Sequence, residues 1–60
     1  MTVREINRLA STGKPVVARY VLAGVLQQGR IIRARVKYGL MQCKTISGDW
    51  AALEEAWEAK

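Results

Sequence analysis

The N-terminal residues carry the spacing of an amphipathic helix. Apolar side chains recur at helical intervals, as on one face of a helix: Val3, Ile6, Leu9 and Ala10. Thr2 and Glu5 fit a capping box, in which the threonine oxygen accepts from the first turn and the glutamate reaches back to the cap. The Ser-Thr-Gly run at 11–13 breaks the pattern. We therefore predict a helix that begins after Thr2 and ends near Ala10.

Residues 15–28 predict a second helix. Pro15 is tolerated at a first helical position, because the N–H that it lacks would be unpaired there, and Gly29 is a natural stop. One face of the helical wheel is apolar: Ala18, Val21, Leu22 and Val25. Further apolar residues fall outside that face: Val16, Val17 and Leu26. We expect a helix that is buried on more than one side or that meets a ligand with apolar patches.

From Arg30 onward the period changes to two. Apolar and basic residues alternate, which is typical of a strand with one apolar and one cationic face. The apolar positions are Ile32, Ala34 and Val36, and the basic positions are Arg33, Arg35 and Lys37. Tyr38-Gly39 is the expected turn, and residues 40–46 are the expected returning strand.

A last helix is predicted after a turn at residues 47–49, capped by Ser47 or Asp49. Three apolar residues would form one stripe on it: Trp50, Leu53 and Trp57. The order is then helix, helix, β-hairpin, helix, which is an α+β fold in a single domain of residues 1–60. A chain this short buries only about 60% of the surface that it exposes when unfolded. That favours a compact binding module over a large active site.

The charge of the chain is basic and unevenly distributed. Ten Lys and Arg residues against five Asp and Glu residues give a net charge of +5. Residues 1–48 hold nine of these cations and one acid, which is +8, whereas residues 49–60 hold one cation and four acids, which is −3. Such asymmetry favours a polyanion as the partner of the basic part. The alternative is a basic surface that meets no nucleic acid.

The sequence offers no catalytic set. It has no histidine and one cysteine, Cys43, so nucleophile–histidine pairs and nearly every zinc site are excluded. We expect no enzyme activity, no metal and no cofactor, and we interpret Cys43 as a small buried residue. The longest uncharged stretch, Tyr20 to Gly29, is too short for a membrane span, and the N-terminus lacks the apolar segment of a signal peptide. We expect a cytoplasmic protein of bacterial or phage origin, without a membrane partner.

Two sets of residues resemble winged helix-turn-helix DNA-binding proteins. Leu22, Val25, Gly29 and Ile31 stand at the spacing L-x-x-V-x-x-x-G-x-I, with which a recognition helix in that family commonly ends and its wing begins. Two stretches are similar to small pilus-operon regulators of the PapI/FaeA type: T-V-R-E-I-N-R-L-A at 2–10 and A-R-Y-V-L at 18–22. The second is followed by Gly29, Arg33 and a basic wing closed by Gly39. The resemblance implies a small winged helix-turn-helix fold with double-stranded DNA as the partner.

The resemblance also assigns roles to seven residues. Four belong to the second helix, which would enter the major groove: Lys14 on phosphate, Val16 on a thymine methyl, Arg19 on guanine and Tyr20 on sugar or phosphate. Three belong to the wing, which would run along the DNA backbone or enter the minor groove: Arg33, Arg35 and Lys37. Two plainer interpretations stay open. Arg19 would pair with an acid, either Glu5 or one in the tail, and the wing cations would be the solvated face of an edge hairpin.

We therefore expect a sequence-specific DNA-binding protein that acts as a transcriptional regulator or as an architectural factor in phage recombination. A homodimer or stacked copies would supply enough contacts for a target site. One alternative is a protein-interaction adaptor or inhibitor, which would use the apolar surfaces of the second and last helices without DNA. Another is an RNA-binding or ribosome-associated protein, although few aromatic side chains are expected outside the core for stacking on bases.

Overall fold

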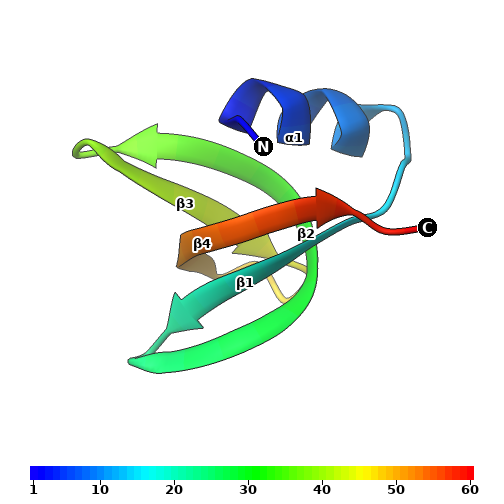
Figure 1. The fold of residues 1–60 in the computed structure, drawn as a ribbon. Coiled ribbons are helices and arrows are strands. Elements are labelled where there is room, and N and C mark those ends of the chain that lie inside the picture. Colours follow the sequence, from blue (N-terminus) through cyan, green and yellow to red (C-terminus); the bar gives the residue numbers. More distant parts are fainter.

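The computed structural model describes residues 1–60 and contains one helix and four strands. These elements are α1 (Val3–Ser11), β1 (Val16–Leu22), β2 (Val25–Lys37), β3 (Leu40–Thr45) and β4 (Trp50–Glu58). The strands are all antiparallel, and they close into a small barrel in the order β1-β2-β3-β4, with β4 paired back onto β1. Helix α1 packs against β2 at one end of the barrel (Figure 1). The predicted helix-helix-hairpin-helix arrangement, and with it the winged helix-turn-helix fold, is wrong.

Helix α1 is one of the elements that the sequence predicted correctly. Thr2 is its N-cap, and the capping box is complete: the Glu5 N–H donates to the Thr2 hydroxyl at 3.1 Å, and the Thr2 N–H donates to the Glu5 carboxylate at 3.1 Å. The hydrogen bond from the Thr2 N–H to the carboxylate, together with the Thr2 side chain, lowers the pKa of the Glu5 carboxyl below its ordinary value. The last helical residue is Ser11 and Thr12 is the C-cap, within the Ser-Thr-Gly run that was expected to break the helix.

The predicted helix at 15–28 is replaced by β1, a tight turn and the first part of β2. The turn lies at Ala23 and Gly24, whose φ angles are +53° and +77°. Positive φ at two consecutive turn residues matches the twist of a two-residue hairpin. Gly29 is no helix stop, because it lies inside β2 opposite Ala18. Valine and tyrosine are favoured on a pleated, half-buried surface, and that preference outweighs the helical spacing of the same residues.

The predicted hairpin at 30–46 is present as the second part of β2 and β3, joined by the turn at Tyr38 and Gly39. A register shift lies between Ile31 and Arg33. It adds Ile32 as the extra residue of a β-bulge, so that both Ile31 and Ala34 are buried, although they are an odd number of positions apart. The basic residues after the bulge therefore all lie on the outside of the barrel.

The predicted last helix is also wrong, because residues 50–58 form β4. Alanine, leucine and glutamate are good helix formers, yet this segment fills the gap between β1 and β3 and pairs with both. A register shift opposite Arg19 and Tyr20 leaves Glu54 as the extra residue. Local helix preference is here outweighed by two rows of backbone hydrogen bonds and by the burial of Ala51.

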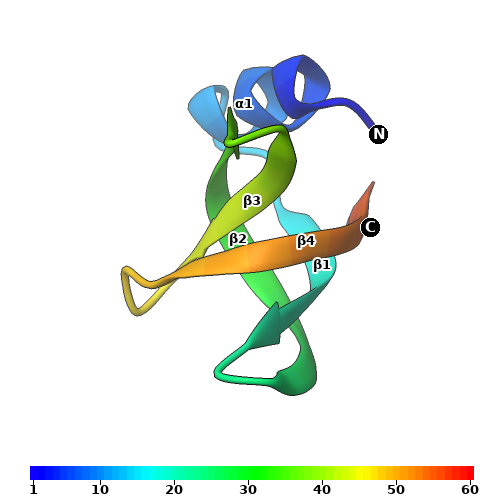
Figure 2. The same ribbon diagram turned by 90° about the vertical axis from the view of Figure 1, so that its left-hand side faces the viewer.

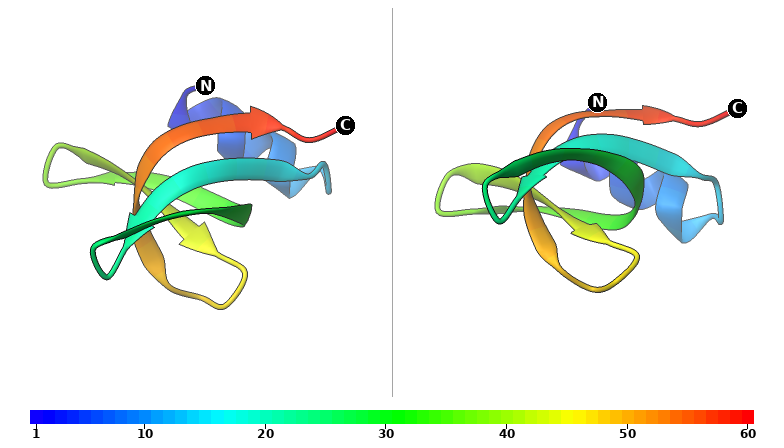
Figure 3. Two further views of the ribbon diagram at one scale, coloured as in Figure 1. Left: turned by 60° about the horizontal axis from the view of Figure 1, so that its bottom comes forward. Right: turned by 90° about the horizontal axis from the view of Figure 1, so that it is seen from below.

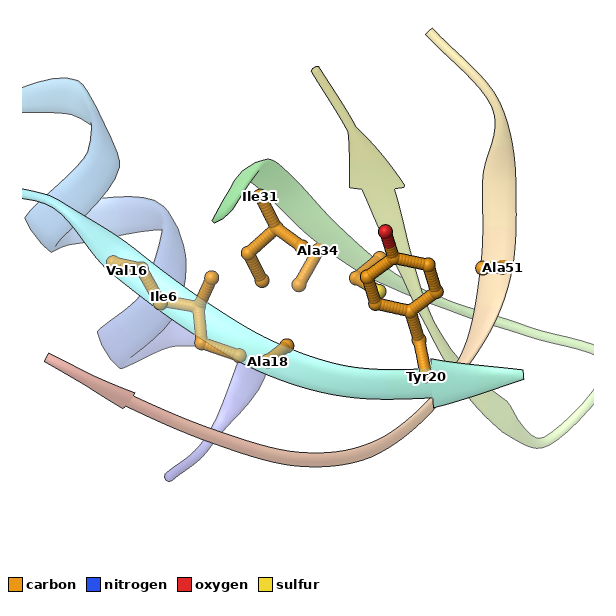
Figure 4. Close-up of a cluster of buried hydrophobic side chains, with 8 residues drawn as sticks. Ile6, Val16, Ala18, Tyr20, Ile31, Ala34 and Ala51 are labelled. Carbon is orange, nitrogen blue, oxygen red and sulfur yellow. The ribbon is translucent and has the colours of Figure 1, made fainter. Parts of the chain in front are cut away.

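The barrel interior is narrow and is filled mainly by small side chains around one ring. Its eight buried hydrophobic residues are Ile6, Val16, Ala18, Tyr20, Ile31, Ala34, Cys43 and Ala51. In Figure 4 the ring of Tyr20 crosses the interior, and alanines from three strands lie around it. Ile6 of α1 is fully buried at the end of the barrel that the helix covers. The views in Figure 3 show the strands curving around this interior with α1 behind them.

Asn7 fastens α1 to the edge of β2. Its side-chain nitrogen donates to the carbonyl of Ala34 at 2.9 Å, and its side-chain oxygen accepts from the N–H of Ala34 at 2.9 Å. The amide thus takes the place of a neighbouring strand for one residue, since a peptide group would present the same donor and acceptor. Helix α1 is not long and apolar enough to cross a membrane, and the chain has no other helix.

Candidate functional site

Four cations gather on the outside of β2 and β3, where they form one exposed surface. Cross-strand pairing places Arg33 opposite Lys44 and Arg35 opposite Gln42, and Lys37 follows at the end of β2. Trp50 of β4 continues the first of these rows, because it pairs with Lys44. We call this surface the basic face and define it by Arg33, Arg35, Lys37, Lys44, Gln42 and Trp50. Strands β3 and β4 turn toward the viewer in Figure 2.

None of the five acids of the chain forms an ion pair with the basic face. Glu5 belongs to the helix cap, and three glutamates lie in the second half of β4, which runs along β1. Asp49, in the turn before Trp50, is the acid nearest to the face in sequence. The protein has one ion pair, between Arg19 and Glu55 at 3.4 Å. The four cations of the basic face therefore have no carboxylate partner, and their charges are available to an anion.

One arginine of the basic face is held in a fixed position. The Arg35 guanidinium lies 3.8 Å from the centre of the Trp50 ring, and its Nε donates to the side-chain oxygen of Gln42 at 2.8 Å. The ammonium of Lys44 lies 5.9 Å from the same ring. Both distances are within the range of cation–π attraction. Arg35 thus extends across β3 toward β4, with its guanidinium over the indole.

A second arginine cluster lies on the other side of the barrel, where β1 is flanked by β2 and β4. The Arg19 guanidinium is 5.7 Å from the Trp57 ring. Its Nε donates to Gln28 at 3.4 Å, and one terminal nitrogen donates to Glu55 at 3.4 Å. The alternative that Arg19 pairs with an acid of the tail is therefore what the structure shows. This cluster contains a carboxylate, whereas the cluster at Trp50 contains a second cation, Lys44.

The structure brings together three of the seven predicted site residues and separates the other four. Arg33, Arg35 and Lys37 share the basic face. Lys14 lies in the loop before β1, beside the C-terminal end of the chain, where the Ala59 N–H donates to the Pro15 carbonyl at 3.0 Å. In Figure 1 that loop and the β2–β3 turn are at opposite ends of the molecule.

Val16 and Tyr20 belong to the core and cannot meet DNA. Val16 is fully buried and Tyr20 is 7% exposed. Both point inward because they alternate with Val17 and Arg19 along β1. Their assignment to base and phosphate contacts depended on a recognition helix at this position, and the segment is a strand. Arg19 points outward but lies in the second arginine cluster, away from the basic face.

Three residues of the basic face were not predicted from the sequence. Gln42 and Lys44 alternate with buried Cys43 and Thr45 in β3, so the alternation of the predicted returning strand was a usable signal for them. Trp50 had no such signal, because its segment was assigned to a helix whose tryptophans were expected in the core. In the strand its side chain points outward and is half-buried.

The surface has two other features, a hollow and a set of exposed apolar side chains. A hollow between α1 and the bulge of β2 is lined by Asn7, Ala10, Ser11, Ile32 and Arg33. Large apolar side chains are exposed at both hairpin turns and at the β3–β4 turn: Val25, Leu26, Val36, Tyr38, Leu40, Met41 and Ile46. Lys37 lies 5.4 Å from the exposed ring of Tyr38, so the basic and apolar surfaces meet at that turn.

Cys43 is enclosed in the core and is not part of any surface site. Burial raises the pKa of its thiol from the ordinary value of 9.0 to about 11. The thiolate, which is the reactive form, is therefore scarce in the folded protein at neutral pH. The cysteine contributes to packing inside β3.

Comparison of the chain with known protein families, with curated proteins and with solved structures gives no match. The resemblance to PapI/FaeA-type regulators gains no support from these comparisons, and the fold that it implied is absent. The basic face is therefore the feature of the molecule that points to a function.

Proposed function

We propose that this protein binds double-stranded DNA through the basic face and holds the phosphate backbone there. The observation that supports the proposal is the set of four cations without carboxylate partners on one exposed sheet surface. Such a protein would act as a small regulator or architectural factor in the cytoplasm of a bacterium or in a phage-infected cell. The free, buried thiol of Cys43 is compatible with that reducing compartment.

The proposed contact is with phosphates rather than with bases. The sheet presents arginine and lysine side chains, and no helix is available to enter the major groove, since α1 is fastened to β2 through Asn7. Lys and Arg on phosphate release counterions, which supplies affinity for any sequence. Four such contacts predict a slope of about −3.6 in log K against log salt for duplex DNA.

The test is fluorescence-anisotropy titration of a labelled random-sequence duplex over a series of salt concentrations. The double variant Arg33→Ala/Arg35→Ala removes two cations from the basic face, and we expect the salt slope to become about two units shallower. The control is Lys14→Ala/Lys60→Ala, which removes the same charge from the opposite end of the molecule. Equal loss of affinity in the two double variants would contradict the proposal, because net charge alone would then explain the binding.

A protein partner is the second candidate function, and the exposed apolar side chains at the hairpin turns favour it. Val25, Leu26, Val36 and Leu40 are each more than half exposed, which is costly unless something covers them. An adaptor of this kind would bind through these turns, and a second copy of the chain is one such partner. The discriminating measurement is salt dependence: a complex that survives high salt and is lost with Val36→Asp would favour the adaptor over the DNA-binding protein.

A further inference from the structure

The two arginine clusters are built to the same plan. In each, an arginine donates through Nε to the glutamine directly opposite it on the neighbouring strand and lies over a tryptophan of β4. Arg35 uses Gln42 and Trp50, whereas Arg19 uses Gln28 and Trp57. Both arginines are thus held by one hydrogen bond and one aromatic ring on the outside of the same barrel.

The clusters differ in the charged group that completes them. Beside Arg19, the carboxylate of Glu55 accepts from a terminal guanidinium nitrogen at 3.4 Å and neutralises the cluster. Beside Arg35 the third group is the ammonium of Lys44, 5.9 Å from the Trp50 ring. Arg35 donates through Nε only, so its two terminal nitrogens have no partner in the protein. Two cations therefore lie within cation–π range of one indole, and neither is paired with a carboxylate.

We infer that the Trp50 cluster is a phosphate-binding site, in which one phosphate group is bound between Arg35 and Lys44. Like charges held together repel each other, and an anion placed between them removes that cost. The Arg35 N–H groups that the protein leaves free are in the geometry that matches two oxygens of a phosphate. The Arg19 cluster needs no ligand, because its guanidinium is already paired with Glu55.

Trp50 and Gln42 act as positioning residues in this site. An arginine side chain loses rotamer freedom when it binds, and fixing it in advance lowers that cost. Since the guanidinium covers the indole at 3.8 Å, that side of the ring does not stack on a base. The inference rests on the proposed function only for the identity of the ligand as a backbone phosphate. It adds that the contact at Arg35 is the strongest phosphate contact and that this contact does not depend on the DNA sequence.

The experiment uses two probes: a random-sequence DNA duplex and inorganic polyphosphate, a chain of phosphates without bases or sugars. The background is the Trp57→Phe variant, in which Trp50 is the sole indole and reports on its own cluster by fluorescence. We expect both probes to change the Trp50 emission and polyphosphate to displace the duplex. If polyphosphate changes the emission and the duplex does not bind, the phosphate site stands and the DNA-binding function fails.

The matched variants are Arg35→Gln and Arg19→Gln, which remove the same charge from the two clusters. We expect Arg35→Gln to weaken duplex binding about tenfold or more and to make the salt slope about one unit shallower. We expect Arg19→Gln to leave binding within about twofold of the parent protein, the change that about 0.4 kcal/mol would produce. Equal effects of the two variants would overturn the inference, as would unchanged Trp50 emission with both probes.

The positioning role is tested by Trp50→Leu, which removes the ring but no charge. We expect duplex affinity to fall about threefold to tenfold, the range for loss of one pre-ordered side chain, while the salt slope stays the same. Trp50→Phe should restore most of the affinity, because it keeps an aromatic face for the guanidinium. Circular dichroism and the urea midpoint of each variant separate these effects from unfolding. A folded Trp50→Leu variant with unchanged affinity would refute the positioning role.

Discussion

Asn7 offers the sharpest test of how the helix is held on the barrel. Replacement by alanine removes both hydrogen bonds to Ala34, each of 2.9 Å. A typical intramolecular hydrogen bond contributes about 1 kcal/mol net, and a buried backbone group left without a partner costs about 1–3 kcal/mol. Water reaches this half-buried contact in part, so we expect a loss of about 2–4 kcal/mol in the free energy of unfolding. A core of this size rarely leaves more than about 3–5 kcal/mol in total.

The assay is urea unfolding of Asn7→Ala followed by tryptophan fluorescence and by far-ultraviolet circular dichroism. Alanine is the better helix former by up to about 0.7 kcal/mol, which acts against the expected loss. Arg4→Ala is the control, because Arg4 is exposed on the same helix and makes no hydrogen bond to a strand. We expect that variant to stay within about 0.5 kcal/mol of the parent protein. A loss for Asn7→Ala no larger than the loss for Arg4→Ala would refute the reasoning.

The Asn7→Asp variant tests the same two hydrogen bonds through the pH dependence of the free energy of unfolding. The introduced carboxylate still accepts from the N–H of Ala34 but faces its carbonyl with a second acceptor, so the charged form is disfavoured in the folded protein. Its folded pKa is raised above the unfolded value. Relative to the parent protein, this variant should be most stable at acid pH, where the carboxyl hydroxyl donates to the Ala34 carbonyl, and should lose stability as the pH rises. A difference independent of pH would contradict the two-bond geometry.

Three further predictions follow from the cap and the core. The pKa of Glu5 is lowered in the folded state, so the capping box stabilises the protein at pH values above the ordinary pKa of a glutamate. This stabilisation is lost as the pH falls through the lowered pKa. The urea midpoints of the parent protein and of Glu5→Gln should therefore converge at acid pH. Burial raises the pKa of the Cys43 thiol from 9.0 to about 11. The parent protein should therefore lose stability relative to Cys43→Ala as the pH rises from 9 to 11. Parallel profiles of stability against pH for the two proteins would disprove this prediction. Ala18→Leu should overpack the barrel and cost about 1–3 kcal/mol, which thermal unfolding measures; an unchanged midpoint would mean that the interior holds free space.

The sequence predicted the elements whose signals are local. The capping box of α1 is decided within four residues, and the hairpin that ends β2 alternates cleanly around the Tyr38-Gly39 turn. The first hairpin gave no comparable signal, because β1 carries apolar residues on its outer face as well as inside. Val17 and Val21 point outward between the buried residues, so the period of two is hidden and a helical face can be drawn through the same side chains.

The barrel as a whole could not be predicted for a different reason. Residues 50–58 favour a helix by composition, and only the presence of β1 and β3 on both sides makes a strand the better state. That information is not contained in the segment itself. The same dependence explains the partial prediction of the site: Arg33, Arg35 and Lys37 share a strand and were found together. Trp50 joins them only through pairing across β3.

The pairing of β4 with β1 also determines which step of folding comes last. The β1–β2 and β2–β3 hairpins join neighbouring segments, whereas β4 pairs with the first strand, so its residues must arrive from the far end of the chain. A lone hairpin is marginal in water, and neither hairpin encloses the Tyr20 ring before β4 closes the circle. We expect folding to be limited by this closing step and unfolding to be all-or-none, with amide hydrogens in both hairpins exchanging at nearly one common rate.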